Sequence, residues 1–135
     1  MVNLKGKEEL LAMKVMSKQR IIGDEKVDQI QDERRIMQDV DHPFIVKLQY
    51  AFHTERTLYL ILEFLQGGDV YQTMQAREAN GEDRFFLEDE ARFIVAEVSL
   101  ALGHLHSLDI AFRDLKPENV LFDMEGHGAR LPVAP

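Results

Sequence analysis

The fold of this chain is decided by the stretch Phe112-Arg113-Asp114-Leu115-Lys116-Pro117-Glu118-Asn119. It places a carboxylate, an ammonium group and a carboxamide close together, on Asp114, Lys116 and Asn119. Pro117 stiffens the turn between them, because its ring fixes φ. Taken alone, the stretch is also compatible with a solvated turn whose polar residues serve only solubility. The segments around it decide between these two interpretations.

Length and composition restrict the class of protein. The chain has 135 residues, enough for one ordinary domain, and 45% of them are hydrophobic, which suits a globular core. It carries 24 acidic and 16 basic residues, a net charge of −8, so we expect no nucleic-acid partner. There is no cysteine, which excludes disulfides and thiolate metal sites. No apolar run approaches the roughly 18 residues of a membrane span, and no signal-peptide pattern is found. We expect an intracellular soluble protein that does not bind membranes.

Hydrophobic patterning predicts strands and helices on both sides of the opening stretch. We expect strands at residues 10–16, 46–52, 57–64 and 120–123, and helices at residues 24–40, 70–77 and 90–107. The last helix has a wide apolar face, which consists of Phe93, Ile94, Val98, Ala101, Leu102 and Leu105.

The motif R-D-L-K-P-E-N at residues 113–119 resembles the catalytic loop of protein Ser/Thr kinases. The sequence H-P-F-I-V at residues 42–46 is typical of the linker after the N-lobe helix of AGC-group kinases, and the spacing is similar to the N-terminal kinase domain of RSK-type kinases. The resemblance implies an α+β, protein-kinase-like two-lobed fold that is incomplete, with a partial N-lobe sheet plus one helix, a hinge and the first part of a helical C-lobe. We expect a partial kinase domain at residues 1–127 (N-lobe about 1–62, hinge 63–69, partial C-lobe 70–127) and a divergent tail at residues 128–135.

The resemblance implies a catalytic role for each polar residue of the loop. Phosphoryl transfer asks the protein mainly to position groups and to neutralise charge. Asp114 would orient the substrate hydroxyl and accept its proton, and Lys116 would reach the transferred phosphoryl group. Asn119 would offer its carbonyl oxygen to magnesium.

Lys14 and Glu33 are implied to act together. The run Leu11-Ala12-Met13-Lys14 resembles the kinase strand whose lysine holds the α and β phosphates of ATP. In the family, a glutamate on the following helix pairs with that lysine, and Glu33 is the candidate here. The alternatives are a lysine whose ammonium group reaches solvent, and a Glu33 that pairs with its arginine neighbours on the surface.

The same resemblance implies an ATP site. The backbone of Glu63 and Leu65 would hydrogen-bond adenine, Leu62 would be the gatekeeper, and Asp69 would contact the ribose. Ala12, Lys14 and Glu118 are the other residues implied to bind the cofactor, which is ATP with Mg²⁺. Asp69 has a second possible role, as the N-cap of the helix that follows.

The sequence departs from the kinase pattern in three places. Leu87 stands where the family has a Ser or Thr helix cap, although acidic residues follow it at the helix start. Phe112 replaces a His or Tyr, and the loop at residues 76–84 is longer than its relatives have.

We interpret the histidines as structural residues and not as metal ligands; they are His42, His104 and His106.

Two parts of a kinase are not found in the sequence. One Gly, Gly6, stands in the region where the family has its Gly-rich loop, and Pro132-Val133-Ala134 stand in the expected register of D-F-G. The resemblance stops after His127, and our hypothesis is that alternative splicing, intron read-through or a frameshift produced the ending. We expect activity to be impaired, because the aspartate of D-F-G is the main magnesium ligand.

Two functions therefore compete. The first is an ATP-dependent protein Ser/Thr kinase, whose full-length parent acts on a protein substrate in the cytoplasm or nucleus. The second is a non-catalytic kinase fragment, either a binding or decoy module that uses its exposed apolar C-lobe surface, or a non-functional splice product. The substitution Asp114→Asn discriminates between them, because only the first predicts a phosphorylation that it abolishes.

Overall fold

The computed structural model describes residues 2–3, 10–17, 40–124 and 128–132. The chain divides into two compact units, one of residues 1–41, 46–64 and 134–135 and the other of residues 42–45 and 65–133. The first contains a β-sheet and the second contains two α-helices, so the predicted α+β class is confirmed. The helix expected at residues 24–40 lies almost wholly outside the described residues.

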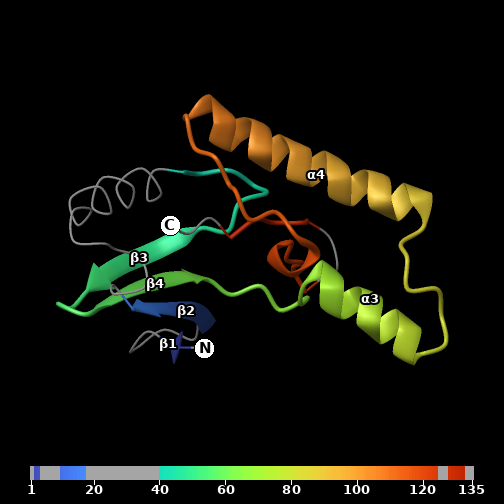
Figure 1. Cartoon of the computed structure of the whole chain (residues 1–135), viewed down its shortest axis with the longest axis horizontal. Helices are drawn as coiled ribbons and strands as arrows, with labels where there is room; N and C mark the ends of the chain where they lie inside the picture. The colour runs from blue at the N-terminus through green and yellow to red at the C-terminus, as the bar shows by residue number, and fades with distance from the viewer. Residues whose placement is uncertain (1, 4–9, 18–39, 125–127, 133–135) are drawn as a thin grey trace. The chain divides into compact units, whose positions relative to one another are not determined.

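The described part of the first unit is an antiparallel sheet (Figure 1). Its strands are β1 (Val2–Asn3), β2 (Leu10–Ser17), β3 (Leu48–His53) and β4 (Thr57–Glu63), in the order β1-β2-β4-β3. Strand β4 lies between β2 and β3, and its side chains from Leu58 to Leu62 are buried or half-buried, as in a strand covered on both faces. The three predicted strands 10–16, 46–52 and 57–64 are thus confirmed to within two residues.

The link between β3 and β4 closes a hairpin. The backbone N–H of Thr54 donates to the carbonyl oxygen of Thr57 at 2.9 Å, and the N–H of Thr57 donates to Oγ1 of Thr54 at 3.2 Å. The rings of Phe52 and Tyr59 stack across the two strands with centroids 5.0 Å apart. Cross-strand aromatic pairs of this kind fix the register of a hairpin.

In the second unit, helix α3 (Val70–Ala79) begins at the predicted cap. Oδ1 of Asp69 accepts a hydrogen bond from the N–H of Gln72 at 2.8 Å, so Asp69 is confirmed as the N-cap. The helix ends two residues later than expected. Its last turn includes Arg77, whose guanidinium stacks over the ring of Phe86 and bonds to the next helix.

Helix α4 (Glu88–Ser107) begins without a capping side chain, because Leu87 has no oxygen to accept a backbone N–H. Glu90 compensates by accepting the N–H of Leu87 at 2.7 Å and by pairing with both terminal nitrogens of Arg77, at 2.6 and 3.0 Å. The hydrogen bond from Arg77 lowers the pKa of Glu90, and the bond from Leu87 lowers it further. The helix therefore begins two residues before the predicted residue 90.

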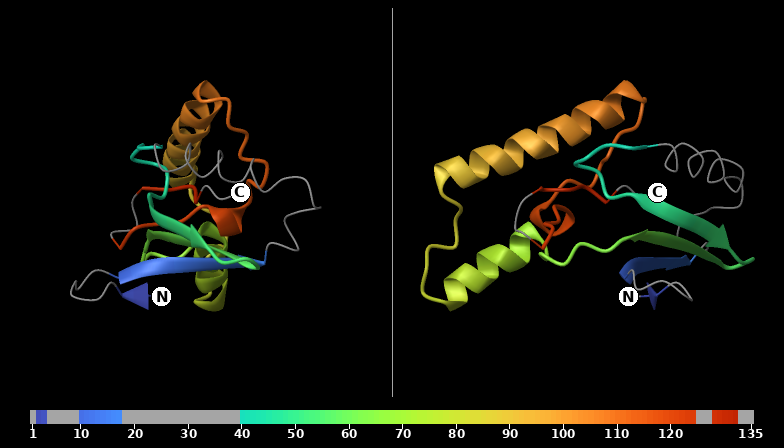
Figure 2. Two further views of the ribbon diagram at one scale, coloured as in Figure 1. Left: turned by 90° about the vertical axis from the view of Figure 1, so that its left-hand side faces the viewer. Right: turned by 180° about the vertical axis from the view of Figure 1, so that it is seen from behind.

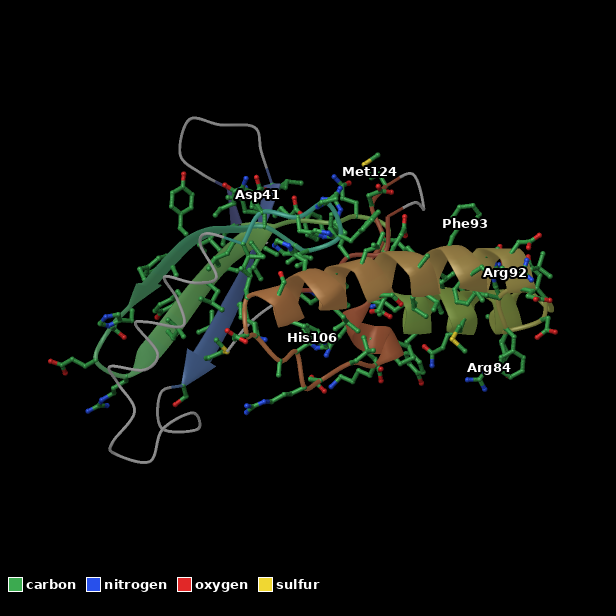
Figure 3. All side chains as sticks on the ribbon, turned by 90° about the horizontal axis from the view of Figure 1, so that it is seen from above. Asp41, Arg84, Arg92, Phe93, His106 and Met124 are labelled. Atoms are coloured by element: carbon green, nitrogen blue, oxygen red, sulfur yellow. The ribbon has the colours of Figure 1, made fainter. Side chains whose placement is uncertain are left out.

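Only part of the predicted apolar face of α4 is buried. Val98, Ala101 and Leu105 are buried, but Phe93 is 73% exposed and projects away from the helix (Figure 3). Five residues separate Phe93 from Val98, and 3.6 residues per turn carry the two side chains to different sides of a helix. Phe93 therefore belongs to the exposed part of the apolar face of α4. No helix in the described ranges is long and apolar enough to cross a membrane.

Short pieces of extended chain pair around Leu121 in place of the regular strand predicted at residues 120–123. Leu121 bridges Asp69 on one side and Arg130 on the other, and Leu131 bridges Ile45. The hydrogen bonds from Val70 to Val120 and from Phe122 to Gly68 extend this arrangement. We call the segments 67–70, 120–122 and 129–131 the Leu121 ladder.

The ladder includes residues that we expected in a divergent tail. Ala129 and Leu131 have no exposed surface, and the N–H of Leu131 donates to the carbonyl oxygen of Phe44 at 3.1 Å. Burial of small and branched apolar side chains in alternation with Arg130 is the pattern of a strand. Ala129 and Leu131 thus pack into the core of the second unit.

His42 and His104 form a contact that the sequence did not reveal. Their rings stack with centroids 4.8 Å apart, and Nδ1 of His42 accepts a hydrogen bond from the N–H of Phe44 at 3.2 Å. Burial lowers the pKa of His42 below its ordinary value, and the neighbouring His104 lowers it further. The described residues contain no group of three or more metal-ligating side chains, and the interpretation of the histidines as structural residues stays a prediction.

Gly67→Ala should destabilise the second unit by about 1–3 kcal/mol, the usual cost of overpacking. A Cβ at Gly67 would lie 2.8 Å from Cβ of Phe122 and closer still to the carbonyl oxygen of Asp123. Gly103→Ala is the matched control, because a Cβ on that helical glycine meets nothing within 4 Å and alanine favours a helix. Urea unfolding should show a loss for the first variant and none for the second; equal stability of the two would contradict the ladder's close packing.

Acidification should destabilise the chain in part through His42. Because the pKa of His42 is lower in the folded state, the unfolded chain takes up its proton first, so stability falls as the pH drops below the ordinary value of 6.5 towards the folded pKa. Thermal melts between about pH 7.5 and about pH 5 should show a smaller fall for His42→Asn than for the original chain. Asparagine keeps an acceptor for the N–H of Phe44 but does not titrate, so parallel curves would refute this contribution.

Candidate active site

The C-terminus of α4 leads towards the candidate catalytic loop at residues 112–119. The N–H of Asp109 donates to the carbonyl oxygen of His106 at 3.1 Å, and the N–H of Ile110 donates to that of Leu105 at 3.0 Å. This is a Schellman motif, and Asp109 takes the left-handed conformation that it requires, with φ of 60°. Aspartate tolerates that conformation better than most residues do.

A strained turn precedes the candidate catalytic carboxylate. Arg113 has φ of 60°, and the N–H of Asp114 donates to the carbonyl oxygen of Phe112 at 2.8 Å. A hydrogen bond between residues i and i+2 around a central residue of positive φ defines a γ-turn, and this turn is rare and strained in L-residues. Conformations of this kind cost on the order of 1–3 kcal/mol and concentrate at functional sites.

The structure brings Asp114, Lys116 and Asn119 together. Nζ of Lys116 lies 3.0 Å from Oδ1 of Asp114, and Nδ2 of Asn119 donates to Oδ2 of Asp114 at 2.8 Å. Nδ2 of Asn119 also donates to the backbone oxygen of Asp114 at 2.8 Å. Both hydrogens of the Asn119 amide are thus engaged, which leaves its carbonyl oxygen as the group that can meet a cation.

The 3₁₀ turn η1 (Pro117–Asn119) gives this cluster its shape. The N–H of Asn119 donates to the carbonyl oxygen of Lys116 at 2.9 Å, and Pro117 begins the turn, where its missing N–H is not needed. Glu118, a candidate cofactor-binding residue, is exposed in the same turn. Figures 1 and 2 show the turn beside α3, where residues of the two elements are in contact.

Some candidate nucleotide contacts lie in the first unit. Ala12 and Lys14 are on β2, opposite Leu62 and Leu60 of β4. The side chain of Lys14 is exposed, so its ammonium group carries no burial cost. Glu63 ends β4, and its N–H donates to the carbonyl oxygen of Lys47 at 3.0 Å.

Other candidate contacts lie in the second unit. No described residue accepts a hydrogen bond from the N–H of Leu65, and its contact with adenine stays a prediction. Asp69 is 9% exposed, and its carboxylate already caps α3. Glu33 lies outside the described residues, so its pairing with Lys14 stays a prediction.

Comparison with known proteins agrees with this geometry. The family model for the protein kinase domain matches residues 2–132. The chain belongs to the protein kinase domain family. It is similar to ribosomal protein S6 kinase alpha-2 of Homo sapiens, with 50% identity over 119 residues, and equally to ribosomal protein S6 kinase alpha-3 of Mus musculus. Ribosomal protein S6 kinase 2 alpha of Gallus gallus is 49% identical over 118 residues.

These matches cover most of this chain but little of the relatives. The two S6 kinases alpha-2 and alpha-3 align over 88% of the chain, and the aligned region is 15% of each relative. The chain therefore spans a small part of the length of the curated kinases that it matches. The match of the kinase family model includes residues 128–132, which the sequence motifs alone did not assign to the domain.

Sequence reasoning missed three features of the site. The strained turn at Arg113 and the close approach at Gly67 depend on backbone geometry that no motif states. The third is Glu97 of α4, whose Oε2 accepts the N–H of Ala129 at 2.7 Å. A signal for Glu97 was present in the sequence, because it directly precedes Val98 of the apolar face of α4. Nothing in residues 128–132 indicated that they contain its partner.

Asp114→Asn should leave the free energy of unfolding within about 1 kcal/mol, because exposed ion pairs contribute little. The side chains of Asp114 and Lys116 are 67% and 46% exposed, and asparagine can still accept the hydrogen bond from Asn119. Urea unfolding of both chains in the same buffer measures the difference. A loss of more than about 2 kcal/mol would mean that this carboxylate supports the fold, contrary to its exposed position.

Proposed function

We propose that this chain is a protein Ser/Thr kinase-type domain that contacts ATP and a protein hydroxyl, with impaired phosphoryl transfer. The observation that carries the proposal is the convergence of Asp114, Lys116 and Asn119 on one strained turn. Membership of the kinase family makes a solvated turn an inadequate explanation of this cluster. The relatives' printed names support a protein as the substrate class.

The chemistry assigned to the cluster follows from its contacts. The carboxylate of Asp114 is oriented by Asn119, so it can hold a substrate hydroxyl and accept its proton as the oxygen attacks phosphorus. Lys116 lies within 3.0 Å of that carboxylate and supplies the positive charge that a transferred phosphoryl group requires. The γ-turn at Arg113 would fix the direction of the Asp114 side chain before substrate arrives.

We propose that ATP is held by the residues implied from the family. The backbone of Glu63 and Leu65 would meet adenine, Asp69 and Glu118 would meet ribose, and Lys14 would meet the phosphates. Ala12, two residues before Lys14 on β2, would contact the adenine ring. Support comes from the N–H of Leu65, which has no acceptor among the described residues, and from the exposed Lys14 side chain. The proposed pairing of Lys14 with Glu33 would present the ammonium group.

Magnesium fits this chain poorly. When bound, Mg²⁺ neutralises phosphate charge, and proteins hold it through one or two carboxylates together with the phosphates. Asn119 contributes one amide oxygen, and no group of three or more metal-ligating side chains is found in the described residues. Pro132-Val133-Ala134 occupy the register in which the family has D-F-G. We therefore propose slow transfer or none, with nucleotide contact retained.

This mismatch also favours the second candidate function, a non-catalytic kinase module. Phe93, Val95 and Leu100 of α4 are 73%, 62% and 58% exposed, an apolar surface that suits contact with another protein. We further propose a cytoplasmic or nuclear location and no nucleic-acid or membrane partner.

Titration of ATP into the full 135-residue chain, with and without Mg²⁺, tests the proposal. We expect saturable binding that weakens in Lys14→Met and is retained in Asp114→Asn. Added Mg²⁺ should strengthen binding by less than about tenfold, since Pro132-Val133-Ala134 stand in the register of D-F-G, whose aspartate normally holds the ion. Any phosphorylation of a generic basic protein substrate should disappear in Asp114→Asn. No saturable binding of ATP would refute the nucleotide part of the proposal.

A further inference from the structure

We propose that Glu97 is a positioning residue that holds the segment 129–131 against the end of the catalytic loop. Its relevance to phosphoryl transfer rests on the function proposed above, although its structural effect does not. Glu97 lies on α4, and its Oε2 accepts the backbone N–H of Ala129 at 2.7 Å in a half-buried position. Thirty-two residues separate the two partners in the sequence, so this is a long-range tertiary contact.

The carboxylate of Glu97 contacts the Leu121 ladder at Ala129, the first residue of the segment 129–131. Immediately after Ala129, Arg130 exchanges two backbone hydrogen bonds with Leu121, at 2.8 and 2.9 Å. One residue further, Leu131 donates to Phe44. The N–H of Ala129 would otherwise be a polar group next to a side chain with no exposed surface, and leaving such a donor without an acceptor is costly.

From Leu121 the connection continues to the catalytic cluster. Val120 closes η1 with a hydrogen bond to the carbonyl oxygen of Pro117 at 3.3 Å, and it also accepts the N–H of Val70 at 3.0 Å. Asn119, which precedes Val120, holds the carboxylate of Asp114. A displacement of the segment 129–131 would therefore also displace Asn119, because Leu121 and Val120 connect the two.

A carboxylate suits this position better than a neutral acceptor. Hydrogen bonds from a backbone N–H to an ionised acceptor are shorter and about twice as strong as neutral ones. The bond of 2.7 Å lies in the short range that such pairs adopt. Glutamine would keep an acceptor oxygen in the same place with a weaker bond, whereas alanine would remove it. This difference separates a positioning role from a mere effect of side-chain volume.

Amide hydrogen exchange of the full chain, without nucleotide, tests the proposal in Glu97→Ala and Glu97→Gln. In Glu97→Ala we expect the amides of Leu121 and Arg130 to exchange at least about tenfold faster relative to those of Val98 and Leu105 on α4. The side-chain amide resonances of Asn119 should move towards those of an exposed asparagine. Glu97→Gln should restore most of the protection.

Glu78→Ala, which removes an exposed glutamate from α3, is the matched control and should change none of these signals. Unchanged exchange in Glu97→Ala would overturn the proposal, and so would an equal acceleration of every amide, which marks general destabilisation.

Failure of the proposed function gives a different result. If the original chain does not bind ATP but the ladder amides respond as expected, the nucleotide proposal fails and the positioning role stands. If ATP binds with the same affinity in the original chain and in Glu97→Ala, and exchange is unchanged, the positioning role fails and the nucleotide proposal stands.

Discussion

Backbone hydrogen bonds around Leu121 are the constraint on which the second unit depends. The segments 67–70, 120–122 and 129–131 are each too short to form a stable strand alone, and they satisfy one another's polar groups in a buried setting. Gly67 allows the approach because a side chain there would collide with Phe122 and the backbone of Asp123. The ladder fixes both ends of a functional region, since Asp69 begins α3 on one side and Asn119 ends the catalytic loop on the other.

The candidate catalytic loop begins with a strained turn at Arg113 and ends with the hydrogen-bonded turn η1. A Schellman motif ends α4, a γ-turn at Arg113 follows, and η1 leads directly into the ladder. Strain at Arg113 persists only because the chain on both sides is held by hydrogen bonds. Asp114 and Lys116 are exposed and Asn119 is half-buried, so the geometry of the cluster comes from the backbone and not from burial. This division leaves the carboxylate of Asp114 accessible from solvent.

The sequence predicted the elements that follow periodic patterns and missed those that depend on tertiary contacts. Strands β2, β3 and β4, helices α3 and α4, and the cap at Asp69 followed from apolar spacing and from the hydrogen-bonding chemistry of aspartate. The start of α4 was misplaced because Glu90, paired with Arg77, replaces the expected cap. The resemblance to kinases located the cluster at residues 114–119, while the roles of Lys14, Glu63, Leu65 and Glu118 in binding a nucleotide remain predictions.

Residues 128–132 show most clearly where motif reasoning ends. Their letters depart from the kinase pattern, yet Ala129 and Leu131 alternate with Arg130 in the way a buried strand requires, and the kinase family model extends over them. Backbone pairing needs suitable spacing of apolar side chains and not a particular motif, and a carboxylate from α4 supplies the remaining acceptor.

The central claim is that the ladder holds the catalytic cluster in place without any ligand. Couplings transmitted through hydrogen bonds in a nitrogen- and carbon-labelled chain test it most directly. The account predicts such couplings in both directions between Leu121 and Arg130, together with close proton contacts between the Asn119 side-chain amide and Asp114. A well-dispersed spectrum for α4 with neither signal would contradict it.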